Sequence, residues 1–397
     1  MTKDTYHSGI ENKMKSIGYC IKALAVRRNV LITSRHDARV PKHIIVFESD
    51  DWGSIRMPSP QVLEELKSKG YQYADNIGYD RYDTLASNQD LEVLMDALFS
   101  VKDVNGYPAK LTMNCVVANP DFEKIRQSDY HEYHYELFTE TLKRYPHHDH
   151  AFALWNEGVK QGVFKPQFHG REHLNARMWL QLLQKGCKPV LDSFNKGVVS
   201  VVVDKKDDER LHSLAAYNIA TESEYDFAKQ SVVEGLDIFE QLFGYRSESM
   251  IAPNYTWDTA IENVATLCGV KYLQGSRYQR HSLYVMHNGG NPELRYTGQC
   301  NANGQIYMVR NCSFEPSENP KKNADFCFAQ IEKCFKRGQA AIISSHRQNF
   351  IGELYPSNRD NNIKQFKDLL KNIVTKYPDV VFMSSDELGG LIEMSYK

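Results

Sequence analysis

The sequence predicts an α/β fold built around a parallel sheet. Short apolar runs of strand length alternate with amphipathic runs of helical length about seven times between residues 43 and 383. The run His43-Ile44-Ile45-Val46-Phe47 is continuously apolar after its first residue, as expected for a strand buried on both faces. Polar residues follow four of these strands, which is where α/β barrels collect their catalytic groups. A barrel and an open sheet both fit this pattern.

Length and composition fit one large domain with extensions as well as they fit two domains. The chain has 397 residues, a net charge of -2, 42% hydrophobic residues and 25% charged residues. This balance argues against a nucleic-acid surface that depends on bulk positive charge. Residues 1–40 read as an amphipathic helix and a basic linker, so we expect an N-terminal helical extension followed by a barrel domain over 41–397.

The N-terminus and the cysteines suggest in which cellular compartment the protein is found. The first 40 residues lack the basic region, apolar run and cleavage site of a signal peptide, and their apolar piece from Ile17 to Val26 is too short to span a bilayer. The eight cysteines include no C-x-x-C pair and fall in expected core segments, which favours reduced, buried thiols. We therefore expect a cytoplasmic protein without a transmembrane segment.

The expected elements follow from apolar spacing along the chain. Helices are predicted where apolar residues recur at intervals of three and four, and two of them end at Gly186 and Gly244. Residues 78–87 and 275–305 are expected to be irregular, and the histidine-rich segment 129–155 is expected to be polar and helix-like without a metal role. The predicted strands are 43–47, 109–117, 163–168, 198–203, 249–253, 270–273, 306–309, 340–345 and 380–383. The predicted helices are 58–69, 90–101, 174–185, 222–243, 259–267, 322–336 and 363–376.

Two histidines four residues apart suggest a metal site. On a helix, His169 and His173 would lie about one turn apart on one face, close enough to bind a single cation. The same letters read H-x-x-E-H, the inverzincin peptidase signature, in which Glu172 would be the general base. A pair of solvated histidines is the third interpretation of this short pattern.

The remaining polar groups stand at other strand ends. Asp50 and Asp51 follow the first strand, Pro253-Asn254-Tyr255 follows a later one, and His346 follows a strand near the C-terminus. In a barrel these ends meet on one face, so the residues are candidates for one site. Asp51 could instead cap a helix, and His346 could be a hydrogen-bonded core residue.

In motif order the chain resembles the polysaccharide deacetylase family, the NodB-like group also called carbohydrate esterase family 4. The likeness extends from about residue 43 to about residue 390. It implies a distorted (β/α)7 barrel of the NodB and glycoside hydrolase/deacetylase type. The motifs that carry it are Ser49-Asp50-Asp51, His169 with His173, Ala252-Pro253-Asn254-Tyr255 and Ser344-Ser345-His346.

The resemblance implies roles for these residues. Asp51, His169 and His173 would bind a divalent metal, with zinc as the default and cobalt, nickel or manganese also suited to nitrogen and oxygen ligands. Asp50 would be the general base, and His346 would protonate the leaving amine. The metal and a backbone N–H near Asn254 would stabilise the oxyanion. Expected substrate contacts are Trp52, Asn254, Tyr255, Trp257 and Arg347.

The implied activity is metal-dependent removal of acetyl groups, N-acetyl in preference to O-acetyl, from a sugar or a polysaccharide precursor. An acetylated carbohydrate is thus the expected partner, and a homo-oligomer is compatible with the sequence. The chain departs from the family pattern at Ile251, where the family has an arginine that pairs with the catalytic aspartate. Arg56 or Arg347 could replace it. The departure leaves open a non-catalytic saccharide-binding member, and the H-x-x-E-H letters leave open an inverzincin-type peptidase that uses His169, Glu172 and His173.

Overall fold

The fold is organised around one long buried strand. The computed structural model describes residues 28–71, 81–199 and 213–396. All nine residues of β1 (Ile44–Trp52) are buried, which is the burial expected for a central parallel strand covered on both faces. β1 pairs with β12 along one edge, and along the other edge first with β13 and then with β2.

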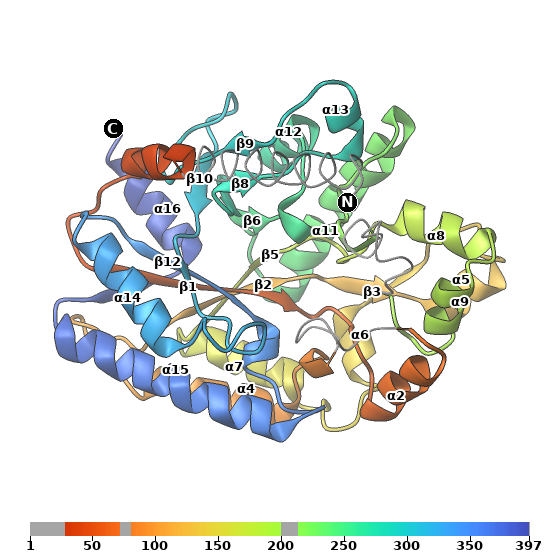
Figure 1. The fold of residues 1–397 in the computed structure, drawn as a ribbon, viewed down its shortest axis with the longest axis horizontal. Coiled ribbons are helices and arrows are strands. Elements are labelled where there is room, and N and C mark those ends of the chain that lie inside the picture. Colours follow the sequence, from red (N-terminus) through yellow and green to blue (C-terminus); the bar gives the residue numbers. More distant parts are fainter. Residues whose placement is uncertain (1–27, 72–80, 200–212, 397) are drawn as a thin grey trace, which may run out of the picture.

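Within the described residues, β1 belongs to a nine-stranded sheet that curls and whose recorded pairings are all parallel (Figure 1). Its order is β10-β7-β6-β5-β2-β1-β12-β11, with β13 added beside β1. The strands are β1, β2 (Leu111–Cys115), β5 (Phe164–Phe168), β6 (Ser249–Ile251), β7 (Tyr272–Gly275), β10 (Ile306–Val309), β11 (Cys312–Ser313), β12 (Ala341–His346) and β13 (Val381–Met383).

The two outermost strands of this order are consecutive in the chain. Only Arg310 and Asn311 separate β10 from β11. The Arg310 amide donates to the Gly275 carbonyl of β7, and the Asn311 amide donates to the Ile342 carbonyl of β12, both at 3.0 Å. The chain itself therefore bridges the two edges, where a regular barrel would have strand pairing. The predicted α/β architecture, a distorted barrel, is confirmed.

Helices cover the sheet in groups. Helices α4, α7, α14 and α15 pack against one another along the lower side of Figure 1, and α11 packs on α12 on the opposite side. A third group, α2, α5, α8 and α9, lies at the right of Figure 1 around β3. The helices are α2 (Pro60–Ser68), α4 (Asn88–Phe99), α5 (Phe122–Gln127), α6 (Phe138–Leu142), α7 (Ala151–Lys160), α8 (Ala176–Gln184), α9 (Lys188–Phe194), α11 (Tyr225–Phe243), α12 (Thr259–Leu267), α13 (Leu283–His287), α14 (Ala324–Phe335), α15 (Pro356–Lys376) and α16 (Ser385–Met394).

Short elements complete the fold. Two antiparallel pairs, β3 with β4 and β8 with β9, stand outside the main sheet. The second pair and α13 give regular structure to part of 275–305, which we expected to be irregular, and β4 interrupts the segment 129–155, which we expected to be helix-like. These elements are β3 (Ala118–Pro120), β4 (Tyr135–Leu137), β8 (Tyr278–Gln279), β9 (Glu293–Leu294) and the 3-10 turns η1 (Ser34–His36), η2 (Glu222–Glu224), η3 (Pro253–Tyr255) and η4 (Arg347–Asn349).

Most predicted elements are present with shifted ends. The predicted helix over 363–376 begins seven residues earlier, at Pro356, because its first turns are polar and give no apolar signal. Residues 198 and 199 of the predicted strand 198–203 are not in a strand, and the rest of it lies outside the described residues, as does most of the N-terminal extension.

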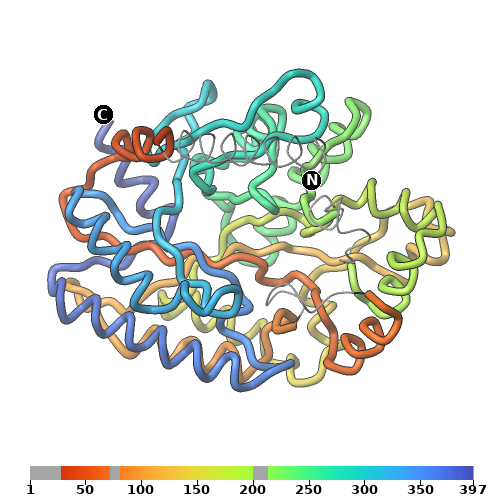
Figure 2. The backbone as a smooth tube through the Cα atoms, viewed as in Figure 1, coloured from red at the N-terminus to blue at the C-terminus, as the bar shows by residue number. Residues whose placement is uncertain are grey.

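The two ends of the described chain pack together (Figure 2). The Ala38 amide donates to the Thr297 carbonyl at 2.7 Å, and the Tyr396 hydroxyl donates to the Gly298 carbonyl at 2.7 Å. Asp37 forms a two-point ion pair with Arg277 at 2.6 and 2.7 Å. These bonds attach residues 37–38 to the barrel. The N-terminal segment and the C-terminus therefore both contact the loop between β9 and β10.

Two other sequence-based expectations can be compared with the described residues. None of their helices is long and apolar enough to cross a membrane. Seven cysteines are described and all are free, but Cys300 is exposed, and Cys187 and Cys268 are only half-buried. The expectation of uniformly buried thiols is therefore wrong for these three, which stand in loops or at helix ends.

Candidate active site

Two consecutive aspartates stand at an irregularity in β1. The pairing of β1 with β2 shifts between Ser49 and Trp52, and Asp51 adopts a left-handed φ of 73°. Neighbouring residues of a regular strand point to opposite faces, whereas a bulge can redirect one of them. Here the bulge brings both carboxylates to histidines: Asp51 lies near His169 and His173, and Asp50 lies near His346.

The two histidines of the H-x-x-x-H pattern lie in a loop. His169 follows β5 directly, and the helix α8 begins only at Ala176. The expectation that a helix presents both rings is therefore wrong. Gly170 has a φ of 103°, which breaks any helical turn between them. The loop is held by backbone bonds from the His169 amide to the Cys115 carbonyl at 2.8 Å and from the Ala118 amide to the Arg171 carbonyl at 2.8 Å.

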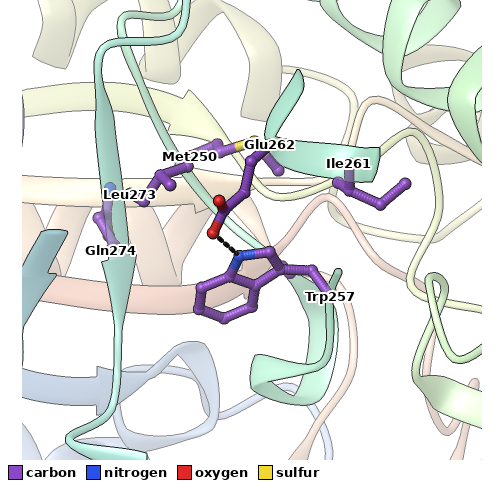
Figure 3. A pocket seen from close by; sticks show the side chains of 7 residues that line it. Met250, Trp257, Ile261, Glu262, Leu273 and Gln274 are labelled. Atoms are coloured by element: carbon purple, nitrogen blue, oxygen red, sulfur yellow. Dashed lines mark hydrogen bonds between the residues drawn. The ribbon is translucent and has the colours of Figure 1, made fainter. Parts of the chain in front are cut away.

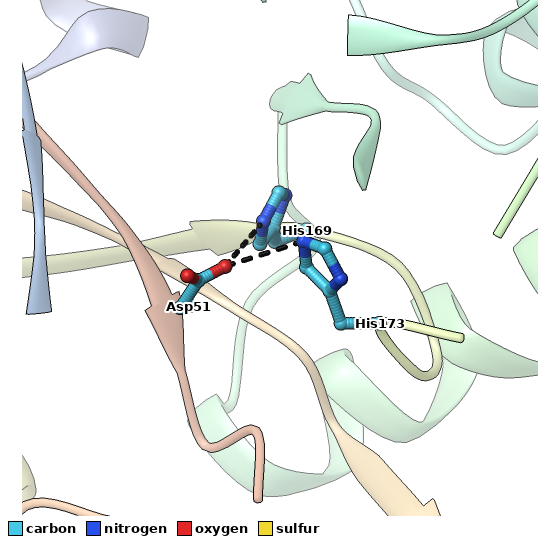
Figure 4. A group of neighbouring side chains, drawn as sticks. All are labelled: Asp51, His169 and His173. Atoms are coloured by element: carbon cyan, nitrogen blue, oxygen red, sulfur yellow. Dashed lines mark ion pairs between the residues drawn. The ribbon is translucent and has the colours of Figure 1, made fainter. Parts of the chain in front are cut away.

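Asp51, His169 and His173 nevertheless converge (Figure 4). One oxygen of Asp51, Oδ1, lies 3.4 Å from His169 Nε2 and 3.3 Å from His173 Nε2. All three side chains are buried. The expected set of metal ligands is thus brought together from β1 and the loop after β5.

The separations of these atoms fit a tetrahedral metal. Ligand atoms about 2.0 to 2.1 Å from a zinc ion lie roughly 3.3 to 3.4 Å from each other at tetrahedral angles. The two distances to Asp51 Oδ1 have these values, and they are long for a strong hydrogen bond. Three protein ligands would leave one position open, as in catalytic zinc sites.

The hydrogen bonds of the two rings also suit a cation. His169 Nδ1 lies 2.9 Å from the Ile251 carbonyl, which can only accept a hydrogen bond, so Nδ1 carries the proton. His169 Nε2 faces a carboxylate oxygen of Asp51 and has no hydrogen-bond partner among the described residues. Burial, with the nearby Arg56 charge, lowers the pKa of His173 well below its ordinary value, so the His173 ring is neutral. A metal ion held by Asp51 and the two rings would supply the missing partner of His169 Nε2.

Asp50 is bound by an arginine that sequence reasoning did not find. Arg310 Nη1 and Nη2 lie 2.7 and 2.6 Å from the two oxygens of Asp50, and Arg310 Nε lies 2.6 Å from Glu48. Asn114 Nδ2 donates to Asp50 at 2.7 Å. Burial alone would raise the pKa of Asp50, but the Arg310 charge outweighs it and lowers the pKa to about 2. Asp50 is therefore ionised at neutral pH.

His346 has a carboxylate partner that was also missed. Its Nδ1 lies 2.6 Å from Glu315 Oε1, and its Nε2 lies 3.8 Å from Asp50. Asn349 Nδ2 fixes the second oxygen of Glu315 at 2.7 Å. Burial lowers the pKa of His346, but Glu315 outweighs it and raises the pKa to about 9. His346 therefore carries its proton at neutral pH and can donate it.

Neither arginine that we considered as a partner for Asp50 has that role. Arg56 Nη2 lies 3.2 Å from Asp51 and Arg56 Nε lies 3.3 Å from Asp83. Arg347 binds the same Asp83 at 2.9 Å and donates to the Ser54 carbonyl at 2.7 Å. Its side chain is fully buried, so its contacts are protein groups, and we assign it to holding the loop after β1. Burial raises the pKa of Asp83, and the two arginines counteract that rise.

Asn254 and Tyr255 stand at the same end of the barrel. Both have left-handed φ values, 55° and 54°, and both are partly exposed. The Tyr255 hydroxyl accepts from Arg310 Nη1 at 2.9 Å, which places this ring beside Asp50. The Tyr255 amide already donates to the Ala252 carbonyl at 3.0 Å, so it is engaged within the turn. A substrate contact for these two side chains stays a prediction.

Trp52 and Trp257, the two tryptophans that we expected to contact the substrate, lie in the core. Trp52 is 1% exposed and packs edge-on against Trp155, with ring centroids 5.9 Å apart. Trp257 is 4% exposed, donates to Glu262 at 3.0 Å and lines a cavity of only about 10 Å³ (Figure 3). Neither ring presents a face to a bound sugar, so we assign both to packing rather than to substrate contact.

Glu172 points into a different network. Arg171 donates to both of its oxygens, at 2.6 and 3.1 Å, and Arg171 also binds Glu234. Glu172 is buried in this ion pair and has no ion pair with the Asp51, His169 and His173 group among the described residues. Arg171, rather than the Asp51, His169 and His173 group, therefore holds the carboxylate of Glu172.

The sequence contained a pattern from which Arg310 and Glu315 could have been predicted as site residues. Arg310 follows β10 directly, and the sequence already predicted a strand over 306–309, whereas Glu315 comes after the short strand β11. The rule that polar residues after a strand belong to the site also applies to them. Their pairing with Asp50 and His346 depends on the chain crossing from β10 to β11, and strand prediction alone does not reveal this crossing.

Comparison with known proteins gives a result at the level of the fold. No family model matches the chain, and no curated protein matches it in sequence. Among solved structures, a protein assigned to the polysaccharide deacetylases from Mycobacterium smegmatis is 9% identical with a TM-score of 0.44, covering 91% of this chain and 94% of that one. Polysaccharide deacetylases are thus among its structural neighbours.

Two further neighbours have related descriptions. A protein assigned as a glycoside hydrolase/deacetylase from Parabacteroides distasonis is 11% identical with a TM-score of 0.48, covering 90% of this chain and 73% of that one. A 4-α-glucanotransferase from Thermococcus litoralis is 11% identical with a TM-score of 0.41, covering 87% and 40%. Since these scores are low, the function has to be argued from the site itself.

Proposed function

We propose that the protein is a metal-dependent hydrolase that removes acetyl groups from a saccharide, N-acetyl in preference to O-acetyl. One observation carries the proposal: a buried Asp51, His169 and His173 group stands beside an ionised carboxylate, Asp50, and a protonated imidazole, His346. Hydrolysis of an amide needs these three parts, a site that activates water, a base and an acid.

A divalent cation bound by the three ligands would lower the pKa of a coordinated water to about 7 and polarise the acetyl carbonyl. Zinc is the cation we expect, and cobalt, nickel or manganese also suit this donor set. Arg56 compensates the negative charge at the second oxygen of Asp51 and orients its carboxylate. Residues that contact metal ligands commonly orient them in this way.

The residues of this chain then have separate tasks. Asp50 takes a proton from the attacking water, and the two-point contact with Arg310 holds its carboxylate in place. His346 gives its proton to the departing amine, and Glu315 keeps that proton on the ring until it is needed. Removing such an acid or base commonly costs about 100-fold to 10,000-fold in rate.

Acetate release from N-acetylglucosamine oligomers tests the proposal. The wild type should release acetate, and both chelation with EDTA and Asp50→Asn should reduce the rate by at least about 100-fold. Asp149→Asn is a matched control, since this aspartate is exposed and contacts none of the residues assigned to the site, and it should leave the rate unchanged. Full activity after chelation, with no metal bound, would falsify the proposal.

A peptidase remains the second candidate because the H-x-x-E-H letters are present. That function requires Glu172 to be the base, so Glu172→Gln would abolish activity while Asp50→Asn would not. The deacetylase proposal expects the reverse for folded protein. A third candidate, saccharide binding without turnover, rested on the absence of an arginine at position 251. Arg310 now supplies that charge, which removes its main support.

A further inference from the structure

A second cavity lies away from the histidines. It has a volume of about 650 Å³, within the usual range for ligand sites, and it is lined by residues of the described chain. Its walls come from the loop after β1, the β3 and β4 pair, α5, the end of α6 and the end of α9. No residue of the proposed catalytic machinery lines it.

The charges that line this cavity cancel. Three acidic and three basic side chains contribute to the lining, and each has a partner of opposite charge. Arg126 binds Glu123 at 2.9 Å, Lys124 binds Asp121 at 2.9 Å, Arg144 binds Glu136, and Lys196 binds Glu65. A phosphate or a nucleic acid would need uncompensated positive charge. The cavity therefore suits a neutral ligand that forms many hydrogen bonds.

Aromatic rings supply an apolar wall. Phe122, Tyr145 and Phe194 line the cavity, and Phe122 and Tyr145 are partly exposed. The Tyr145 hydroxyl has no hydrogen-bond partner among the described residues, and burial raises the pKa of this phenol to about 12, so it stays a neutral donor. Rings beside hydroxyl, amide and paired charged groups match a saccharide, which has C–H faces and many hydroxyl groups.

The cavity is joined to the proposed catalytic site by a short rigid turn. Asn119 accepts from the Ile55 amide at 2.9 Å and donates to the Gly53 carbonyl at 2.9 Å. The Ser54 amide donates to the Asp51 carbonyl at 3.1 Å. Ile55 lines the cavity and is four residues from Asp51, which limits their separation to about 14 Å.

From these observations we propose that the cavity between α5, α6 and α9 is a binding site for neutral saccharide, separate from the metal ligands. The binding itself does not depend on the proposed catalytic function. If that function holds, the cavity retains part of a sugar chain while an acetylated unit lies at the metal, so longer oligomers are preferred through KM.

Calorimetric titration of EDTA-treated protein with N-acetylglucosamine oligomers of one to six units tests this site without any turnover. The wild type should bind the hexamer more tightly than the monomer, and inorganic phosphate should not bind. Tyr145→Ala should weaken hexamer binding about tenfold or more. Tyr107→Ala, which removes an exposed tyrosine elsewhere, should leave it unchanged.

Arg126→Ala provides a second variant in case Tyr145→Ala fails to fold, because this arginine is on the exposed rim. It should weaken hexamer binding severalfold. Wild-type affinity in both folded variants, or binding of phosphate in preference to the hexamer, would overturn the proposal. Hexamer binding with these losses, together with no acetate release by the zinc-loaded wild type, would refute the catalytic function and support the saccharide site.

Discussion

Arg310 and Asp50 form a buried two-point ion pair that joins the end of β10 to the end of β1. The contacts are 2.6 and 2.7 Å, and the side chains are 3% and 4% exposed. The same guanidinium binds Glu48, so one cation compensates two buried carboxylates. Because Arg310 stands where the chain crosses between the sheet edges, the closure of the fold and the orientation of the proposed base depend on one residue.

Replacing this arginine should cost both stability and activity. Arg310→Met leaves Asp50 and Glu48 buried without their guanidinium partner, and losing one member of a buried pair typically costs about 3 to 5 kcal/mol. Denaturant unfolding should show this loss. Arg126→Ala removes an exposed ion pair and should change stability by less than about 1 kcal/mol. Equal stability of the two variants would contradict the assigned role of Arg310.

Metal binding should stabilise the fold through the three ligands. At a zinc concentration 100 times Kd, the expected gain is about 2.7 kcal/mol, seen as a raised melting temperature that EDTA reverses. His173→Ala should remove both the bound zinc, measured by elemental analysis, and the stabilisation. His150→Ala changes an exposed histidine and should keep both. If His173→Ala retained one zinc per chain, the assignment of this ligand would be wrong.

The pH dependence of turnover should report the pKa of His346. Glu315 raises this pKa to about 9, so the acid is protonated at neutral pH and kcat falls as pH rises through about 9. Removing the negative charge in Glu315→Gln lowers the pKa, so the alkaline decline should move to lower pH by about one unit or more. Glu318→Gln, in the same loop and paired with Lys322, is the control. An unmoved decline in Glu315→Gln would exclude His346 as the acid.

The turn after Asp51 should be sensitive to one added methyl group. Gly53 has a φ of 80°, and a Cβ there would lie 2.5 Å from the Val116 carbonyl oxygen. Gly162 has a φ of 76° with open space around it. Gly162→Ala should cost about 1 to 2 kcal/mol from backbone strain alone, and Gly53→Ala should cost about 1 to 3 kcal/mol more from the clash. Thermal unfolding of both variants measures the difference, and equal losses would mean that the turn has room.

The sequence was sufficient for the architecture and for part of the site. Continuous apolar runs predicted most strands, because a strand that is buried on both faces needs apolar residues at every position. Polar residues after these strands identified Asp50, Asp51, His169, His173 and His346, which the structure brings together at one end of the barrel.

Only the tertiary structure decided the partners of these residues. Arg310 reaches Asp50, and Glu315 reaches His346, through contacts between positions 260 and 31 residues apart in the chain. Local patterns contain no information about such pairings, because they depend on which strands become neighbours. For the same reason the sequence could not show that Trp52, Trp257 and Arg347 are buried in the protein. Their residue types suit a sugar site and a core equally well, and packing alone decides between the two.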